Sequence, residues 1–398
     1  MKTMNRRSFF AKSAFAAGSA FWTPPMFSAI RGENYKCAVI GRTGRGDYGH
    51  GLDTIFKGIE GVTVIAVADE NEEGLKRAAE RSGAKRLYVD YREMLEKEKP
   101  NLVSIAPRQP DCHRDMALAA IEAGAHIYME KPISECPQEA DDILDAANRR
   151  GLKISVAHTR RYMDHFLQIK KLLEDGYLGE ILEFCFHGKQ DARVGGEDLI
   201  VLGSHDMDIM RYYLGDPLWC FASVSVEGRD IEPQDVRLGL REPYTVAGDT
   251  IRADYQFQHN IQCRWSSVKA ADWNRSFPFQ DKTINKWGFE IFGTKRVLSY
   301  QESLGAFVSD FPFLALGDSA SPWTPIEKIA AIEKPKILSH PIRNLIHAIE
   351  SDEKPLCSGE DARWSVEMVN AVYHAQIAQA RISFPLKKRG HPLKKWKN

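Results

Sequence analysis

Two polar motifs in this chain carry residue types that can move a proton and stabilise a charged oxygen. Glu130-Lys131-Pro132 follows an apolar run, and Gly203-Ser204-His205-Asp206-Met207-Asp208 opens a stretch with helical spacing. A lysine can stabilise an oxygen that develops negative charge, and a histidine titrates near neutrality and can take a proton. Lys131 and His205 are therefore candidate catalytic residues. Either motif alone is equally compatible with a structural lysine at a sheet edge or a structural helical histidine.

A glycine-rich turn upstream predicts a dinucleotide site. It follows an apolar run that ends at Ile40, and Asp69 ends the next apolar run about 23 residues beyond Gly46, near the spacing of the nucleotide fingerprint. Such a turn aims backbone N–H groups at a pyrophosphate, and a carboxylate at Asp69 would accept ribose hydroxyls and favour NAD over NADP. Thr43 stands where the fingerprint has its middle glycine. The predicted cofactor-binding residues are Gly41, Arg42, Thr43, Gly44, Arg45, Gly46, Asp69, Glu130 and Lys131.

Apolar runs alternate with helical stretches in the part of the chain that carries the glycine-rich turn and Lys131. Strands are expected at 37–40, 62–67, 102–106, 126–129 and 153–157, and helices at 50–58, 73–82, 91–98, 113–123 and 137–149. Strands separated by helices imply right-handed crossovers and a parallel, doubly wound sheet. Lys131 then leaves the carboxyl end of a central strand, the edge where open parallel sheets bind ligands.

After residue 157 the pattern changes. A helix at 163–175 is followed by alternating or aromatic-rich runs near 180–186, 220–226, 250–257, 261–266 and 289–292, and then by helices at 341–351 and 359–381. Few helices separate these strands, which favours antiparallel pairing. We therefore expect an α/β protein with an N-terminal Rossmann domain at 34–157. A C-terminal α/β domain at 158–398 would carry an open, mostly antiparallel sheet.

The first 33 residues resemble a twin-arginine export signal. Arg6 and Arg7 precede an alanine-rich, weakly apolar run, and no acidic residue occurs before Glu33. The run is too short for a stable membrane span. A periplasmic location is therefore expected. The alternative is an amphipathic N-terminal helix on a cytoplasmic protein.

Charge balance and cysteine spacing argue against nucleic-acid binding, membrane-surface binding and metal-centred function. Lys+Arg and Asp+Glu balance at 54 each, which argues against a broad surface for nucleic acid or anionic lipid, and the lysine-rich C-terminal tail favours a solvated end. The seven cysteines form no C-x-x-C pair, so neither a disulfide framework nor a zinc site is indicated. No metal site is predicted, because no His, Cys and Asp cluster has ligand spacing.

With these motifs in hand, the chain resembles the glucose–fructose oxidoreductase / inositol dehydrogenase (Gfo/Idh/MocA) family of NAD(P)-dependent enzymes. The resemblance rests on Glu130-Lys131-Pro132, Arg160-Arg161-Tyr162, Gly176-Tyr177-Leu178-Gly179-Glu180-Ile181 and the segment 196–208. It implies that Lys131 and His205 flank a nicotinamide. It also implies a homodimer or homotetramer. The residues it implicates in substrate binding are Arg161, Tyr162, Asp191, Arg193 and Asp208.

One departure from the family pattern concerns the histidine. Many members carry an aspartate four residues before it, where this chain has Val201. A carboxylate partner for His205 is then missing, or is supplied by another acidic residue nearby. The candidates are Asp208, Asp198 and Glu197.

The expected reaction is NAD-dependent oxidation of a secondary hydroxyl of a sugar or glycoside. NAD does not cross membranes freely, so an exported enzyme would hold its cofactor and reoxidise it on the protein. One alternative is an NAD-dependent glycosidase that oxidises transiently and eliminates. Another is a non-catalytic protein that retains NAD, for which the missing carboxylate is the best support.

Overall fold

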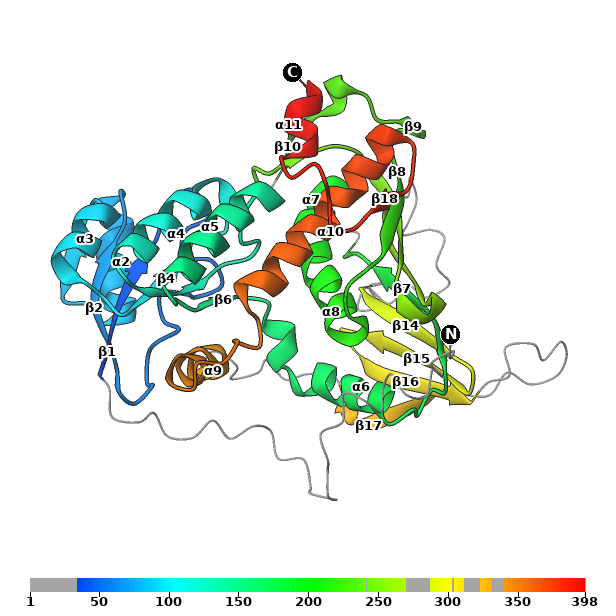
Figure 1. Ribbon diagram of the computed structural model, residues 1–398, viewed down its shortest axis with the longest axis horizontal. Helices are drawn as coiled ribbons and strands as arrows, with labels where there is room; N and C mark the ends of the chain where they lie inside the picture. Colours follow the sequence, from blue (N-terminus) through cyan, green and yellow to red (C-terminus); the bar gives the residue numbers. More distant parts are fainter. Residues whose placement is uncertain are drawn as a thin grey trace, which may run out of the picture.

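The computed structural model describes residues 34–189, 191–240, 242–269, 287–302, 304–310, 323–330 and 339–397. The predicted export signal at 1–33 lies outside these ranges. Two sheets stand side by side, with a long helix between them (Figure 1).

The first sheet is parallel, with strand order β3-β2-β1-β4-β5-β6. Its strands are β1 (Tyr35–Ile40), β2 (Val62–Ala68), β3 (Arg86–Tyr88), β4 (Leu102–Ile105), β5 (His126–Met129) and β6 (Ile154–Val156). The helices are α2 (Glu72–Ser82), α3 (Tyr91–Glu98), η1 (Pro110–Cys112), α4 (His113–Glu122) and α5 (Pro137–Arg149). The predicted doubly wound parallel sheet is confirmed. The short strand β3 was not predicted, because none of its side chains is fully buried and it has no apolar run.

The helix predicted at 50–58 is wrong. Residues 42–60 form a series of turns with one isolated bridge between Arg42 and Asp47. Positive φ angles occur at Gly44, Gly46, Gly49, Gly51 and Gly58. A right-handed helix cannot pass through residues with positive φ, so the glycines keep this segment in turns.

The second sheet is mostly antiparallel, as predicted, and among its described strands only β7 and β13 pair in parallel. Its order is β17-β16-β15-β14-β7-β13-β12-β8-β18, with β9 beside β8. The strands are β7 (Ile181–His187), β8 (Trp219–Val226), β9 (Arg229–Asp230), β12 (Thr250–Gln256), β13 (Gln262–Val268), β14 (Gly288–Gly293), β15 (Arg296–Gln301), β16 (Gly305–Asp310), β17 (Thr324–Ala330) and β18 (Ile382–Ser383). A separate hairpin pairs β10 (Arg237–Leu238) with β11 (Thr245–Val246).

The helices that follow β6 along the chain are η2 (Thr159–Tyr162), α6 (Asp164–Glu174), α7 (Gly196–Asp198), η3 (Leu199–Gly203), α8 (Ser204–Leu214), η4 (Pro233–Asp235), η5 (Gln258–Asn260), α9 (Ser339–Glu350), α10 (Gly359–Ala378) and α11 (Pro392–Lys397). Helices α6, α8 and α10 cover one face of the second sheet, whereas Ile342 and Leu345 of α9 belong to a core of the first sheet. Side chains of α6, α8 and α10 share one hydrophobic core with the strands. On the other face, Leu182 and Phe221 are 40% and 42% exposed, as expected where alternate strand residues face outward.

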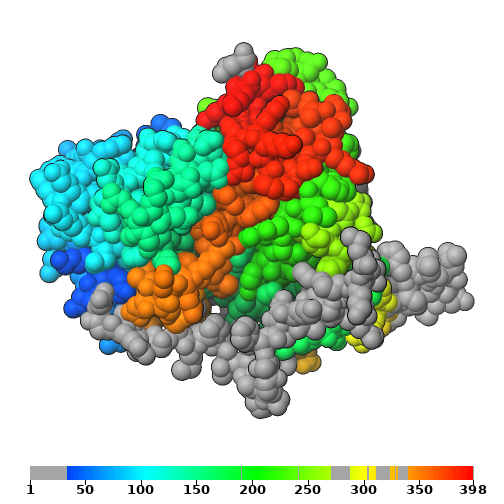
Figure 2. Space-filling view, viewed as in Figure 1, coloured from blue at the N-terminus to red at the C-terminus, as the bar shows by residue number. Residues whose placement is uncertain are grey.

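Helix α10 joins the two halves of the molecule. Its Ala362 and Val366 belong to the core of the first sheet, whereas Met368 belongs to the core of the second. In the space-filling view the orange-to-red α10 fills the seam between the blue-cyan and green parts (Figure 2). One rigid helix shared by both cores fixes the two sheets relative to one another.

The C-terminal tail packs against the protein, contrary to the solvated end that its lysines suggested. Leu393 of α11 is fully buried, and Arg389 bridges Asp141 of α5 and Glu367 of α10. In the described ranges, no helix combines the length and apolar character that a membrane span requires.

Candidate active site

Lys131 lies at the carboxyl end of β5 and is 4% exposed. Its Nζ donates a hydrogen bond to the carbonyl oxygen of Val201 at 2.7 Å. Val201 lies in η3, a π-helical turn directly before α8. A π turn follows i→i+5 winding and is often found at functional sites. The position where a carboxylate was expected therefore meets Lys131 through its backbone.

Burial lowers the pKa of Lys131 to about 8. Glu130 and Glu242 act in the opposite direction and raise it, whereas Lys189 and Arg108 lower it further. At neutral pH most Lys131 side chains then carry a proton. An ammonium has three donors, so two remain beyond the bond to Val201.

Glu130 clamps the glycine-rich segment to the end of β5. Its side chain is fully buried, and Oε1 accepts hydrogen bonds from the His50 backbone N at 2.9 Å and from His50 Nδ1 at 2.5 Å. Oε2 accepts from the Lys131 backbone N at 2.9 Å. A Cβ at Gly49 would lie 2.4 Å from Glu130 Oε1, so only glycine permits this approach. Glu130 thus fixes the position of Lys131 relative to the glycine-rich turn.

The turn after β1 fits a dinucleotide. Gly44 has φ +82°, and a Cβ placed there would meet no atom within 4 Å, so its surface faces open space. Gly46 has φ +88°, and a Cβ there would lie 2.4 Å from the Arg108 backbone N. Both positions need glycine, one for its conformation and the other also for close approach. Free space over a glycine turn at this sheet edge is what a pyrophosphate requires.

Asp69 is 2% exposed at the end of β2. It accepts hydrogen bonds from the Thr43 backbone N at 3.0 Å and from Thr43 Oγ1 at 2.7 Å, and one from the Asn71 backbone N at 2.9 Å. Thr43, in the place of the middle glycine, therefore gives this carboxylate a partner inside the turn. At the mouth of the same turn, Arg42 and Arg45 lie 3.8 Å and 2.5 Å from Asp111.

His205 comes from the first turn of α8. Burial lowers its pKa well below the ordinary value, and nearby positive charges add to this. These charges come from Lys131, His158, Arg160 and His50. A neutral imidazole can accept a proton, as the proposed chemistry needs. Within the described residues, His205 Nδ1 has no hydrogen-bond partner.

The carboxylates considered as partners for His205 are engaged elsewhere. Asp208 accepts from Arg161 Nη2 at 2.7 Å and from Arg161 Nε at 2.9 Å. Asp198 accepts from Ser267 Oγ at 2.8 Å, and Glu197 accepts from the backbone N of Leu240 at 2.9 Å and of Glu242 at 2.8 Å.

Asp206, next to His205, also has a structural contact. It accepts from Arg160 Nη1 at 2.5 Å and from Trp265 Nε1 at 2.9 Å. Burial raises its pKa to about 6 despite the arginine. The polar neighbours of His205 in sequence thus anchor α8 to η2 and β13.

The residues predicted to bind substrate fall into two groups. Arg161, Tyr162 and Asp208 are buried, and the Tyr162 hydroxyl donates to Asn344 Oδ1 at 3.0 Å. Asp191 and Arg193 pair with each other on the loop before α7. The structure brings Glu130, Lys131 and His205 to one place. It pairs Arg161 with Asp208 in an ion pair within the chain. That these five residues bind substrate stays a prediction.

Sequence reasoning missed residues that lie close to Lys131 and His205. They are His50, His158, Lys189 and Trp287. The His158 ring lies edge-on to that of His205, and Lys189 Nζ lies 4.4 Å from the Trp287 ring centre. For His158 a signal existed, because it directly follows the last predicted strand of the first sheet. Across the described ranges, no group of three or more His, Cys, Asp or Glu residues could hold a metal ion.

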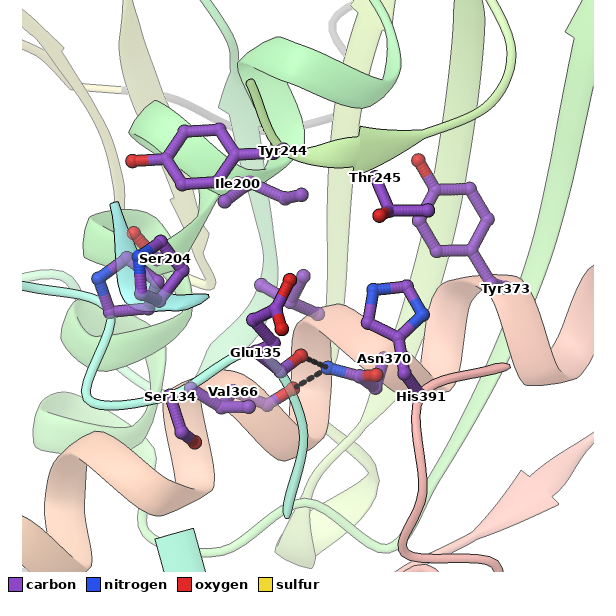
Figure 3. Close-up of a pocket in the computed structure, with 13 residues that line it drawn as sticks. Ser134, Glu135, Ile200, Ser204, Tyr244, Thr245, Val366, Asn370, Tyr373 and His391 are labelled. Atoms are coloured by element: carbon purple, nitrogen blue, oxygen red, sulfur yellow. Dashed lines mark hydrogen bonds between the residues drawn. The ribbon is translucent and has the colours of Figure 1, made fainter. Parts of the chain in front are cut away.

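A narrow cavity lies where the loop after β5, the start of α8 and α10 meet (Figure 3). Ser134, Glu135, Ser204 and Asn370 are among its lining residues, and Asn370 Nδ2 donates to the carbonyls of Glu135 and Val366 at 3.3 Å and 2.9 Å. The cavity lies between the two halves of the molecule. Two of its lining residues, Pro132 and Ser204, are the sequence neighbours of Lys131 and His205.

The sequence is similar to known oxidoreductases. Residues 35–158 match a family described as oxidoreductase family, NAD-binding Rossmann fold. Oxidoreductase P35 of Formosa agariphila is 28% identical over 40% of this chain, and the chain spans 55% of the length of that relative. An inositol 2-dehydrogenase of Klebsiella pneumoniae is 25% identical over 63% of this chain and 79% of its own length.

Among solved structures, a levoglucosan dehydrogenase in complex with NADH and levoglucosan has a TM-score of 0.67 at 20% identity. The match covers 89% of this chain and 100% of that structure. This likeness extends over both sheets and shows the shared fold.

Proposed function

We propose that this protein oxidises a secondary hydroxyl of a carbohydrate with NAD. The premise is the match of residues 35–158 to the Gfo/Idh/MocA oxidoreductase family with its NAD-binding Rossmann fold. The observation that carries the proposal is the position of Lys131. Its ammonium leaves the carboxyl end of β5 and lies 2.7 Å from the Val201 carbonyl, just before the helix that carries His205. Dinucleotides bind at this edge of a doubly wound sheet.

Each residue then has a separate task. Bound NAD supplies the hydride acceptor. Lys131 donates a hydrogen bond to the hydroxyl oxygen and stabilises the negative charge that develops there. His205, which is neutral because of its burial and its cationic neighbours, takes the hydroxyl proton. Glu130 binds no reacting atom. It keeps Lys131 and the glycine turn in register.

The substrate class proposed is a sugar or cyclic polyol. The similar proteins named above are an inositol 2-dehydrogenase and a levoglucosan dehydrogenase in complex with NADH and levoglucosan. Trp287 offers an aromatic surface near the site, and its ring is approached by Lys189 and Arg160. An aromatic ring beside cations suits a polyhydroxyl ring that has one apolar face.

The proposal extends to where and how the cofactor is used. The arginine pair and apolar run in residues 1–33 support export to the periplasm, with a cytoplasmic location as the alternative. An exported enzyme would keep NAD bound and regenerate it in the site. The exposed face of the second sheet, with Leu182 and Phe221, supports a homo-oligomer.

The first experiment asks whether NAD is held and what is oxidised. The purified protein is denatured and its supernatant assayed for NAD(H), and native protein is incubated with sugars, cyclic polyols and glycosides with and without added NAD. Net nicotinamide reduction by a free sugar supports the dehydrogenase. Glycoside cleavage without net reduction identifies the glycosidase instead. NAD retention with no turnover of any compound would support the non-catalytic alternative.

Replacing Lys131 tests the residue that carries the proposal. Lys131→Met removes the ammonium but keeps an unbranched side chain, and we expect kcat to fall by about 10²–10³-fold, as for other removed donors to a developing oxyanion. NADH affinity, measured by nicotinamide fluorescence, should change little. The matched control is Lys36→Met, at an exposed position at the opposite end of the sheet, which should keep full activity. Unchanged kcat in Lys131→Met would exclude this mechanism.

A further inference from the structure

His158 is a buried histidine whose ring makes no hydrogen bond. It directly follows β6, is 1% exposed, and neither ring nitrogen has a partner within the described residues. Its backbone is fixed, because its N–H donates to the Val156 carbonyl at 2.7 Å and its carbonyl accepts from Cys357 Sγ at 3.1 Å. Leaving a buried polar group unpaired costs free energy, so such groups are rare in folded proteins and call for an explanation.

The ring of His158 faces the ring of His205. Their centroids are 5.4 Å apart and their planes lie at 88°, an edge-on arrangement. His205 Nδ1 also has no partner within the described residues. Two neighbouring imidazoles therefore present unpaired nitrogens in the same region, at the carboxyl edge of the parallel sheet. Position 201, where the family resemblance implied a carboxylate, is valine in this chain.

Four charged side chains act on His158, from the end of β5, η2, α8 and α10. Burial lowers its pKa, Asp208 of α8 and Asp361 of α10 raise it, and Arg161 and Lys131 lower it. The two carboxylates are themselves paired to Arg161, at 2.7 Å for Asp208 and 3.5 Å for Asp361. A neutral imidazole has one donor and one acceptor nitrogen, so neutral His158 can accept a hydrogen bond from a neighbouring ring.

We propose that His158 completes a two-histidine proton relay with His205 and takes the place of the missing carboxylate. The contact is made directly or through one bridging water, which the polar nitrogens on both rings would hold. His158 orients His205 and receives its proton without touching substrate, so it is a positioning residue. This inference rests on the proposed oxidation of a secondary hydroxyl.

The proton and electron balance of the step is simple. The O–H bond of the substrate breaks and its proton goes to Nε2 of His205, while the proton on Nδ1 passes to a nitrogen of His158. NAD, held by the glycine-rich turn after β1, would supply the acceptor for the hydrogen and electron pair that leave the carbon, so that a carbonyl group would remain. One proton thus ends on the histidine pair and leaves to solvent later.

The test compares His158→Leu, His158→Gln and the wild-type protein. We expect kcat of His158→Leu to fall by about 10–10²-fold, below the loss for a direct general base, with NADH affinity unchanged. Neutral His158 accepts a hydrogen bond from Nδ1–H of protonated His205 and stabilises that cation, so removing it should lower the His205 pKa and shift the acid limb of the kcat profile to lower pH. His158→Gln keeps a donor and an acceptor and should recover part of kcat. Added imidazole should rescue a His158→Ala variant.

A second readout does not depend on turnover. Nitrogen-15 NMR of the imidazole groups follows the titration of His205 in protein without substrate, and the His205 pKa should fall in His158→Leu. The matched control is His165→Leu, since His165 is also buried at 5% exposure and also has an unpartnered ring nitrogen, but its ring stacks on Tyr300. This control should leave the pH profile and the His205 titration unchanged.

The outcomes separate this inference from the proposed function. An active wild type whose His158→Leu variant keeps kcat and an unchanged His205 titration would overturn the relay alone. So would weakened NADH binding with kcat retained, because His158 would then be a cofactor contact. Absence of turnover in the wild type would overturn the proposed function, and the NMR titration would still decide whether the two rings are coupled.

Discussion

Two histidines at the same sheet edge are equally buried, yet their surroundings differ. His113 is fully buried, and its Nδ1 and Nε2 lie 2.8 Å and 2.7 Å from the carbonyl oxygens of Pro132 and Pro107. His158 is 1% exposed and has no ring hydrogen bond within the described residues. The paired ring ties the loops after β4 and β5 together. The unpaired ring makes no such tie, and its nitrogens are available for chemistry.

The contrast extends to the neighbours of each ring. On the cofactor side, Glu130 and Asp69 accept hydrogen bonds from the loops around them, which holds the shape of the turn. Around α8, the Arg161–Asp208 pair holds the helix, while His158 and His205 keep ring nitrogens that have no partner among the described residues. Fully paired buried groups thus hold the loops and α8 in place, whereas the unpaired nitrogens of His158 and His205 are the ones proposed to take part in the reaction.

The largest expected loss of stability comes from removing Arg161 from its ion pair with Asp208. Arg161→Met leaves the Asp208 carboxylate buried without its partner and should lower the free energy of unfolding by about 3–5 kcal/mol, measured by urea denaturation. The double variant Arg161→Met/Asp208→Leu should recover much of this loss, because no uncompensated charge remains. If Arg161→Met were as stable as wild type but bound substrate poorly, Arg161 would be a substrate ligand, as the family resemblance implied.

Replacing each histidine by leucine sharpens the comparison directly. A neutral His113 ring donates from one nitrogen only, so His113→Leu leaves one carbonyl, of Pro132 or of Pro107, without its donor and should cost up to about 3 kcal/mol, at roughly 1–3 kcal/mol for an unsatisfied buried group. His158→Leu removes no ring hydrogen bond and should cost far less while reducing kcat. Equal stability losses in the two variants would contradict the distinction drawn here. Denaturation curves and kcat for both variants decide it.

A smaller effect, with a defined pH dependence, is expected at Glu130. Burial acts to raise its pKa, but the hydrogen bond from His50 and the charges of His50 and Lys131 outweigh this and hold it below its ordinary value of 4.5. A lowered folded pKa means that the carboxylate stabilises the fold above about pH 4.5 and that this contribution is lost as pH falls through the folded pKa. Glu130→Gln should therefore cost about 1.5–3 kcal/mol at pH 7.

The same variant provides its own control in acid. Because both proteins carry a neutral side chain at position 130 once Glu130 is protonated, the stability difference should shrink as the pH falls well below 4.5. A difference that stayed constant across this range would mean that the charge of Glu130 contributes nothing. Asp53→Asn, at another buried carboxylate that pairs with Arg81 away from Lys131, is a matched comparison for stability with activity retained.

Much of the fold followed from local patterns. Apolar runs and helical spacing placed β1, β2, β4, β5 and β6 and the helices α2 to α5 close to their observed bounds. Hydrophobic periodicity works here because each strand is buried on both faces and each helix buries one face. The helix predicted at 50–58 was wrong because spacing was weighed above the positive φ that its glycines adopt. The glycine turn and the lysine after β5 were found because both follow an apolar run directly.

What the sequence determined by itself was therefore the set of elements and the residue types at their ends, including Lys131 and His205. Only the tertiary structure decided which of these groups have partners. The π turn that brings the Val201 carbonyl to Lys131, and the packing of α10 that sets His158 beside His205, join residues far apart along the chain. Local sequence cannot encode such contacts, because they depend on how two hydrophobic cores share one helix.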